Sequence, residues 1–194
     1  MKTIPDKLFW RALAAGLGLL FLLSLGWFGF QALAGGAEPW QAAANLLLLS
    51  LPLGLLCGSL ALLAAAARQH SRTGRLGARL SAWVRRLPRA AGGLIAGFIA
   101  LFSLDVFSEG GDLGQMLLAL LLHSSPALGL ALALALAWRW PWVGLALFGA
   151  AALWILGISL GRGWLILGNL LTFVLPLAAI AGLFAADWRW NRRA

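Results

Sequence analysis

The chain has little charge and few chemically reactive side chains. Only 11% of its 194 residues are charged, just six are acidic, and 62% are hydrophobic. Soluble domains carry about a quarter charged residues, so this composition excludes an ordinary soluble domain. Cys57 is the only cysteine and lies inside an apolar run. An intrachain disulfide is therefore excluded, and a metal site built on thiolates is not expected.

Several sequence motifs of enzymes are also missing. The chain has no His-Glu-x-x-His motif, no phosphate-binding loop and no pair of aspartates within an apolar run. One histidine and one aspartate near the apolar runs are too few ligands for a convincing metal site. We therefore expect a protein that is not an enzyme and that holds neither a metal nor a cofactor.

Long apolar runs dominate what is present. A run of about 20 residues in a helix spans the ~30 Å of a bilayer core, and no segment alternates as the strands of a barrel do. The sequence thus predicts an all-α, polytopic membrane protein with one transmembrane domain. The first run is interpreted as a retained anchor, because it is longer than the apolar core of a signal peptide. Six transmembrane helices are predicted, near residues 9–33, 43–67, 91–107, 113–138, 142–160 and 164–186.

The basic residues predict the orientation of these helices. With six spans, 14 of the 15 lysines and arginines fall on one side of the membrane, and only Arg162 falls on the other. The positive-inside rule then places both termini in the cytoplasm, and we expect the cytoplasmic (inner) membrane of a prokaryote. The net charge of +9 is explained by this topology, so nucleic-acid binding is not expected.

Residues 68–89 form the one long predicted connection. Within it, Leu76, Leu80, Val84 and Leu87 form an apolar stripe at helical spacing. We predict an amphipathic helix that lies on the cytoplasmic lipid surface and ends at Pro88; docking of a protein partner is the alternative. Its arginines are expected to attract anionic lipid. They are Arg72, Arg75, Arg79, Arg85 and Arg86.

The spans also suggest a threefold repeat of helical hairpins, at residues 9–67, 91–140 and 142–190. Pro52, Pro126 and Pro176 each follow a glycine of the preceding turn by 15 or 16 residues. Two copies share Asn-Leu-Leu, beginning at Asn45 and Asn169, and two share Trp-Arg-Trp. The prolines should kink their helices. Ser124 and Ser125 are expected to bond carbonyls that Pro126 leaves free.

Polar side chains inside apolar spans are the candidate site residues, because burying them is costly. His123 lies about ten residues into the stretch from Leu113 to Trp142. It could relay protons, ligate a tetrapyrrole iron or simply hydrogen-bond a neighbouring helix. Asp105 could contribute to an acidic patch or mark an interfacial helix end. The complete candidate set is Asp105, His123, Ser124, Asn45 and Asn169.

The last four spans resemble a family of small, uncharacterised prokaryotic four-helix membrane proteins, over about residues 92–190. That family pairs an Asp-x-Phe segment with a His-x-x-Pro segment, which correspond here to Asp105–Phe107 and His123–Pro126. The resemblance implies an architecture and no activity. The first hairpin and the basic connection would be additions to it.

Two functions remain open from the sequence. The first is a non-enzymatic accessory, assembly or scaffold module that binds a membrane-protein partner or a second copy of itself. The alternative is a small transporter or proton-coupled carrier that uses Asp105 and His123. The first is favoured, because the spans offer few polar groups with which to build a pathway.

Overall fold

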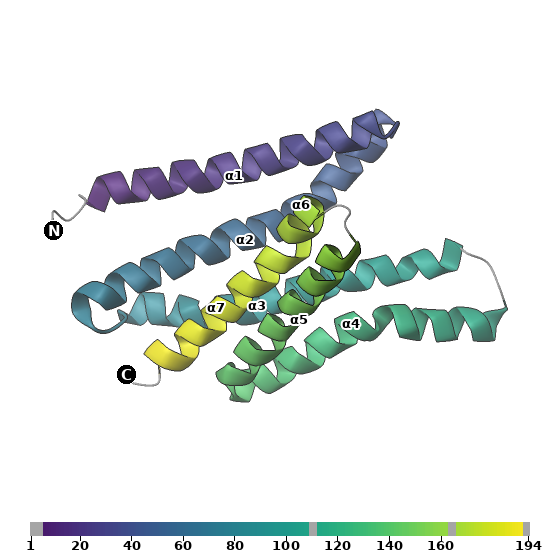
Figure 1. Cartoon of the computed structure of the whole chain (residues 1–194). Coiled ribbons are helices and arrows are strands. Elements are labelled where there is room, and N and C mark those ends of the chain that lie inside the picture. Colours follow the sequence, from purple (N-terminus) through teal and green to yellow (C-terminus); the bar gives the residue numbers. More distant parts are fainter. Residues whose placement is uncertain (1–5, 109–111, 163–165, 192–194) are drawn as a thin grey trace.

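The computed structural model describes residues 6–108, 112–162 and 166–191, and all of their regular structure is helical (Figure 1). Five segments are long and apolar enough to cross a membrane: α1, α2, α4, most of α5, and the run Leu167–Trp190. The elements are α1 (Asp6–Ala34), α2 (Pro39–Thr73), α3 (Ala78–Phe102), the 3₁₀ segment η1 (Ser103–Ser108), α4 (Leu113–Arg139), α5 (Pro141–Arg162), α6 (Ile166–Asn169), the π-helical turn η2 (Leu170–Val174) and α7 (Leu175–Trp190).

The prediction that one long connection occupies residues 68–89 is wrong. Helix α2 continues to Thr73 and α3 begins at Ala78, so only residues 74–77 separate the two helices. Gly74 caps α2 with a φ of 70°, a left-handed conformation that glycine adopts without a steric penalty. Its N–H donates to the carbonyl of His70, which closes the last turn of α2.

Pro88 does not end a helix, contrary to the prediction. It lies buried inside α3, so the amphipathic segment and the third apolar segment form one continuous helix. The apolar stripe of Leu76, Leu80 and Val84 packs against α2 and α7 rather than standing alone. The hydrophobic contacts along this stripe offset the single backbone hydrogen bond that proline removes.

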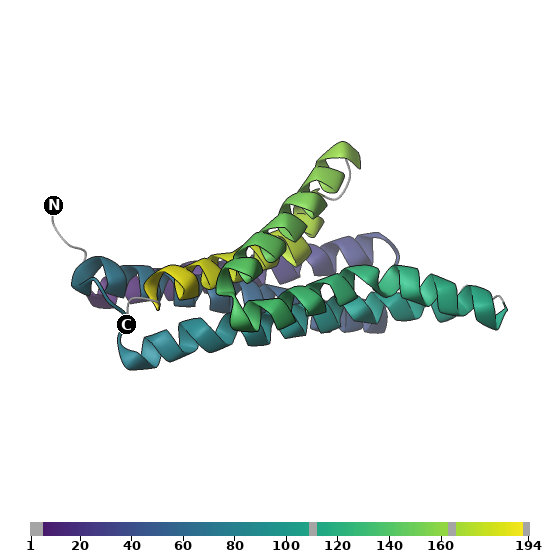
Figure 2. The same cartoon turned by 90° about the horizontal axis from the view of Figure 1, so that it is seen from below.

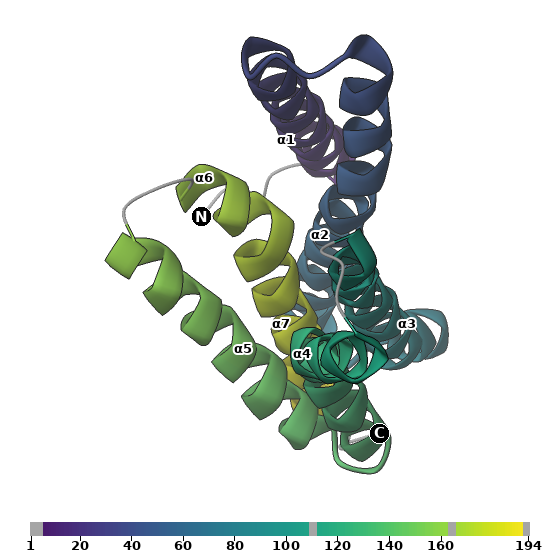
Figure 3. The same cartoon turned by 90° about the vertical axis from the view of Figure 1, so that its right-hand side faces the viewer.

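Helix α7 lies at the centre of the molecule. It packs against α2, α3 and α5, and most of its residues are buried. Figure 3 shows α5 on one side of α7, α2, α3 and α4 on the other, and α1 farther out, beyond α2. The hairpins α1–α2, α3–α4 and α5–α7 each pair neighbouring helices, and the start of α1 and the end of α7 lie toward the same end (Figure 1).

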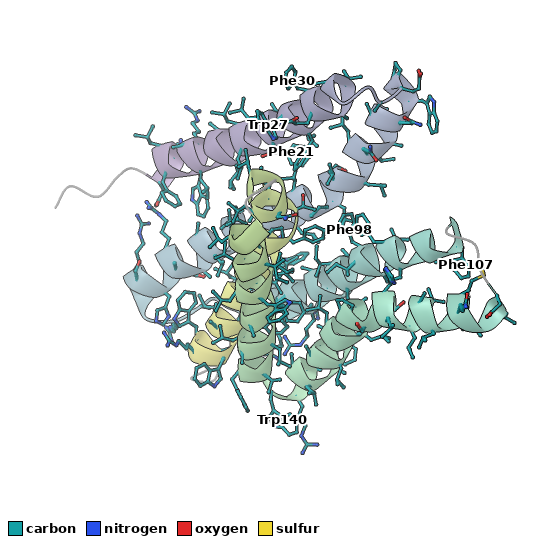
Figure 4. All side chains as sticks on the ribbon, turned by 45° about the vertical axis from the view of Figure 1, so that its right-hand side comes forward. Phe21, Trp27, Phe30, Phe98, Phe107 and Trp140 are labelled. Carbon is teal, nitrogen blue, oxygen red and sulfur yellow. The ribbon has the colours of Figure 1, made fainter. Side chains whose placement is uncertain are left out.

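An ion-pair cluster connects the two helices of the first hairpin, α1 and α2. Asp6, at the start of α1, pairs with Arg68 and Arg72 of α2 at 2.8 and 2.7 Å. Arg68 also lies over the ring of Phe9, 4.1 Å from its centroid. Only Ser24 of α1 is buried, so this helix remains largely exposed along its length. In Figure 4, Trp27 and Phe30 lie on α1 at the edge of the molecule, whereas Phe98 lies where α3 meets the other helices.

The three repeat prolines have different surroundings. Pro52 and Pro176 are buried, whereas Pro126 is exposed. Ser125 donates to the carbonyl of Leu122 at 2.7 Å, which is the group that Pro126 leaves without its helical donor. This confirms the expected role for Ser125. The π-helical turn η2 ends just before Pro176, where the missing proline N–H and the ring favour a wider turn.

Candidate functional site

His123 faces away from any helix partner among the described residues. Its side chain is exposed, and Nδ1 lies 2.9 Å from the carbonyl oxygen of Ala119, one turn back in α4. Since a carbonyl can only accept, Nδ1 is the donor in this bond. Ala127 and Leu130 lie on the same helix face as His123 and are buried. His123 is exposed because the N-terminal half of α4, to which it belongs, projects past α5 and α7 (Figure 1). The structure therefore does not support a hydrogen bond from His123 to a neighbouring helix.

Replacing His123 by leucine should leave the stability of the isolated protein nearly unchanged. The substitution removes only a bond within one helix, and such exposed changes stay within about 0.5 kcal/mol. The check is the thermal unfolding midpoint in detergent, followed by intrinsic tryptophan fluorescence. A fall of several degrees would reveal an interhelical role for the imidazole.

The other predicted site residues do not converge on His123. Asp105 lies in η1, but its side chain lies outside the described part of the structure. Asn45 is exposed on α2, and Ser124 lines a groove between α3 and α4. The described residues thus form no joint site around His123.

Asn169 does take part in an interhelical contact. Its Nδ2 donates to Ser159 Oγ at 3.1 Å, and that buried hydroxyl donates in turn to the carbonyl of Ile155 at 2.8 Å. This short chain of hydrogen bonds ties the C-terminal end of α5 to α6. Asn45, its counterpart in the proposed repeat, is exposed, so the two asparagines lie in different surroundings.

Ser159 also lies in a Gly-x-Ser-x-Gly sequence, Gly157 to Gly161, which is a motif of serine hydrolases. In hydrolases this motif forms a sharp turn between a strand and a helix. Here it lies inside α5, and the hydroxyl is bonded to a carbonyl and an amide, neither of which is a base. The helical context therefore gives no support to a nucleophilic serine.

A buried polar cluster joins α3 and α7, and sequence reasoning missed it. Arg89 Nη1 donates to Asp187 Oδ2 at 2.9 Å, and Asn191 Nδ2 donates to Asp187 Oδ1 at 2.7 Å. Ser81 Oγ donates to Asn191 Oδ1 at 2.8 Å. The Asp187 and Arg89 side chains are only 4% and 16% exposed. Both carboxylate oxygens are thus hydrogen-bonded, which a buried charge requires.

Two sequence signals could have indicated this cluster. Asp187 and Asn191, the residue that caps α7, are four residues apart, which is the spacing of neighbours on one helix face. Asp187 is also the only acidic residue in the arginine-rich end of the chain, where a carboxylate has several possible partners. Next to the cluster, His70 of α2 stacks on Trp190 of α7 with ring centroids 4.9 Å apart. The cluster therefore lies where three helices meet.

A groove of about 820 Å³ opens between α4, α5 and the η2–α7 run. We call it the α4–α5 groove. Figure 2 shows its origin, since α4 and α5 start from a common turn and then diverge. Small residues form much of its floor, Ser159 and Asn169 lie at one end, and Trp154 on the rim is 72% exposed. The floor includes Gly129, Ala133, Ala150 and Ala151.

The arginines that are expected to attract anionic lipid lie on the surface. Arg75 lies in the connection after α2, and Arg79, Arg85 and Arg86 are exposed on the first half of α3. Arg72 is exposed at the end of α2 and is paired with Asp6. Arg75, Arg79, Arg85 and Arg86 are therefore exposed to ligands outside the helical body, whereas Arg72 is already engaged by Asp6.

No cluster of three or more potential metal-binding side chains occurs among residues 6–108, 112–162 and 166–191. Cys57 points toward α1, where its thiol donates to the carbonyl of Leu17 at 3.6 Å. The thiol is thus used in packing the first hairpin.

Comparison with known proteins identifies the family to which the chain belongs. Residues 77–194 match DUF7670, a domain of unknown function, and this region contains α3, α4, α5, α7 and the α3–α7 polar cluster. The match includes the whole of the region 92–190, in which the sequence resembles an uncharacterised membrane-protein family. No curated protein and no solved structure matches the chain. Because the matched region is more than half of the chain, the protein belongs to the DUF7670 family.

Proposed function

We propose that the protein is a non-enzymatic membrane accessory or assembly module. In this proposal, the α4–α5 groove holds one apolar transmembrane helix of another membrane protein. The observation that carries the proposal is the groove itself, about 820 Å³ in volume, open along one side and bounded by helices that diverge. Apolar grooves are a common mode of recognising helices.

The lining of the groove suits a helix. Gly129, Ala133, Ala150 and Ala151 have little or no side chain, so a partner backbone could approach closely, as helices in membranes do. Ser159 and Asn169 could bond a polar side chain of the partner.

A six-span topology with both termini in the cytoplasm supports this role. In this proposal, the second half of α3 together with η1 would add a sixth span to the five segments that are long and apolar enough to cross a membrane. The α2–α3 connection, the start of α1 and the end of α7 would then share the arginine-rich cytoplasmic side of a prokaryotic inner membrane. The pairing of α1–α2, α3–α4 and α5–α7 supports three parallel hairpins, although their prolines differ in burial.

The carrier alternative has less support. His123 is bonded within its own helix and lines neither the α4–α5 groove nor the groove that contains Ser124. A proton path needs a chain of polar groups, and the α4–α5 groove offers three polar residues among its sixteen lining residues.

Photo-crosslinking in native membranes tests the proposal. A benzophenone amino acid at Ala150 should give one discrete adduct with a different membrane protein, and one at Gly16 of α1 should not. The second substitution Gly129→Leu should abolish the adduct, because a side chain at Gly129 meets nothing within 4 Å and so fills the groove without disturbing the fold.

The control for Gly129→Leu is Gly16→Leu, which is equally free of clashes and lies on α1. It should leave the adduct intact. An adduct between two copies of this chain, or no protein adduct at Ala150, would contradict the accessory role.

A further inference from the structure

A second groove lies on the opposite face of α4, between α4 and α3. Its volume is about 540 Å³, and its α3 wall consists of Gly93, Ala96, Gly97 and Ala100. Beyond its end lies a shallow, open depression of about 610 Å³ lined by Arg86, Arg89, Ala90 and Trp138. Trp138 lines both spaces, so the apolar groove and the basic depression adjoin at this side chain. We call the combined feature the α3–α4 groove.

The α3 residues of this feature lie on one face of the helix. Arg86, Ala90, Gly93, Gly97 and Ala100 follow one another by four, three, four and three residues. At ~1.5 Å per residue they cover ~21 Å, which is enough for a headgroup region and one leaflet of ~15 Å. The groove thus has a cationic end, which we call the head, and an apolar remainder along Gly93, Gly97 and Ala100. Its length matches that of a phospholipid headgroup with one acyl chain.

The charges at the head differ in their availability. Arg89 is bonded to Asp187, which fixes its position and offsets its charge. Arg86 is exposed and makes no ion pair with any described residue. The lining contains no acidic side chain among the residues that the structure describes. The head therefore carries a net positive charge that a guanidinium can present to a phosphate through paired hydrogen bonds.

We propose that the α3–α4 groove binds one anionic phospholipid from the leaflet on the arginine-rich side. Its phosphate is held by Arg86, with Arg89 alongside, and the ring of Trp138 lies at the level of the headgroup, where tryptophan is favoured. One acyl chain lies along Gly93, Gly97 and Ala100 against α4. A zwitterionic lipid is disfavoured, because its own cation is repelled by Arg86. This site does not depend on the partner helix in the α4–α5 groove.

Native mass spectrometry of the full chain, titrated with phosphatidylglycerol or phosphatidylcholine, tests the site. One phosphatidylglycerol should be retained per chain, with phosphatidylcholine lost more readily. Arg86→Gln should weaken phosphatidylglycerol binding about tenfold, as expected for the loss of a hydrogen bond to a charged group. Gly97→Phe should also weaken it, because a side chain there meets nothing within 4 Å and occupies the acyl-chain groove.

Two controls separate a defined site from general attraction. Arg85→Gln removes the same charge from a neighbouring exposed residue that lines neither space, and Gly16→Phe adds the same bulk on α1. Both should bind phosphatidylglycerol as the unmodified chain does. Equal losses for Arg85→Gln and Arg86→Gln, full binding by Gly97→Phe, or equal retention of the two lipids would each overturn the proposal.

Discussion

Replacing Asp187 by alanine should lower the free energy of unfolding by about 3 kcal/mol, because it strands a mostly buried arginine. Arg89 is 16% exposed and would lose its only carboxylate partner among the described residues, while Asn191 would lose one acceptor. In a chain of this size, the unfolding midpoint falls by about 2–4 °C for each kcal/mol. Tryptophan fluorescence during heating in detergent measures this change.

A paired substitution distinguishes the stranded charge from the loss of the interaction itself. Changing Arg89 and Asp187 together to leucine removes both charges, and such apolar replacements often restore stability. The double variant should therefore be more stable than Asp187→Ala. Asp112→Ala serves as a matched control, since Asp112 is an exposed helix cap and should cost only about 1 kcal/mol. If Asp187→Ala is no worse than Asp112→Ala, the cluster does not hold α3 to α7.

Gly144→Ala should destabilise the fold by about 1–3 kcal/mol through overpacking. A Cβ at Gly144 would lie 2.6–2.8 Å from ring atoms of Phe184, which is fully buried. That ring cannot move freely, because its centroid lies 5.6 Å from that of Phe148, which is itself packed on Gly92. Two phenylalanines are thus each seated on a glycine of a neighbouring helix.

The control for this prediction lies five residues away on the same helix. A Cβ at Gly149 would meet only Ala181 Cβ at 4.0 Å, an ordinary contact. Gly149→Ala should therefore be neutral or stabilise by up to about 1 kcal/mol, because alanine is the better helix former. Adding Phe184→Leu to Gly144→Ala should recover part of the loss. Equal midpoints for Gly144→Ala and Gly149→Ala would contradict the close packing of Phe184 on α5.

The helical class and most helix positions could be predicted from the sequence, because runs of about 20 apolar residues leave no other backbone arrangement in a bilayer. The predicted extent of α3 was wrong. Proline was interpreted as a stop at Pro88, but packing of Leu80 and Val84 on α2 and α7 carries the helix through it. Propensity is a local effect, and tertiary contacts can outweigh it.

The candidate site residues predicted from the sequence have different surroundings in the fold. Asn169 proved to be an interhelical contact, whereas His123 is exposed and Asn45 meets no polar partner among the described residues. Asp187 was overlooked because a carboxylate near several arginines at a chain end is usually solvated. Its burial depends on Ser81 and Arg89, about a hundred residues earlier in the chain.

The sequence by itself determined that this is a helical protein with segments long and apolar enough to cross a membrane. The tertiary structure decided that α7, not the histidine-bearing α4, is the central helix, and that grooves flank α4 on both faces. The physical reason is that lipid and protein interior are both apolar, so hydropathy does not distinguish a face that packs from one that meets lipid. Tertiary contacts make that distinction, among them those of Phe148 and Phe184 with Gly92 and Gly144, and the Arg89–Asp187 pair.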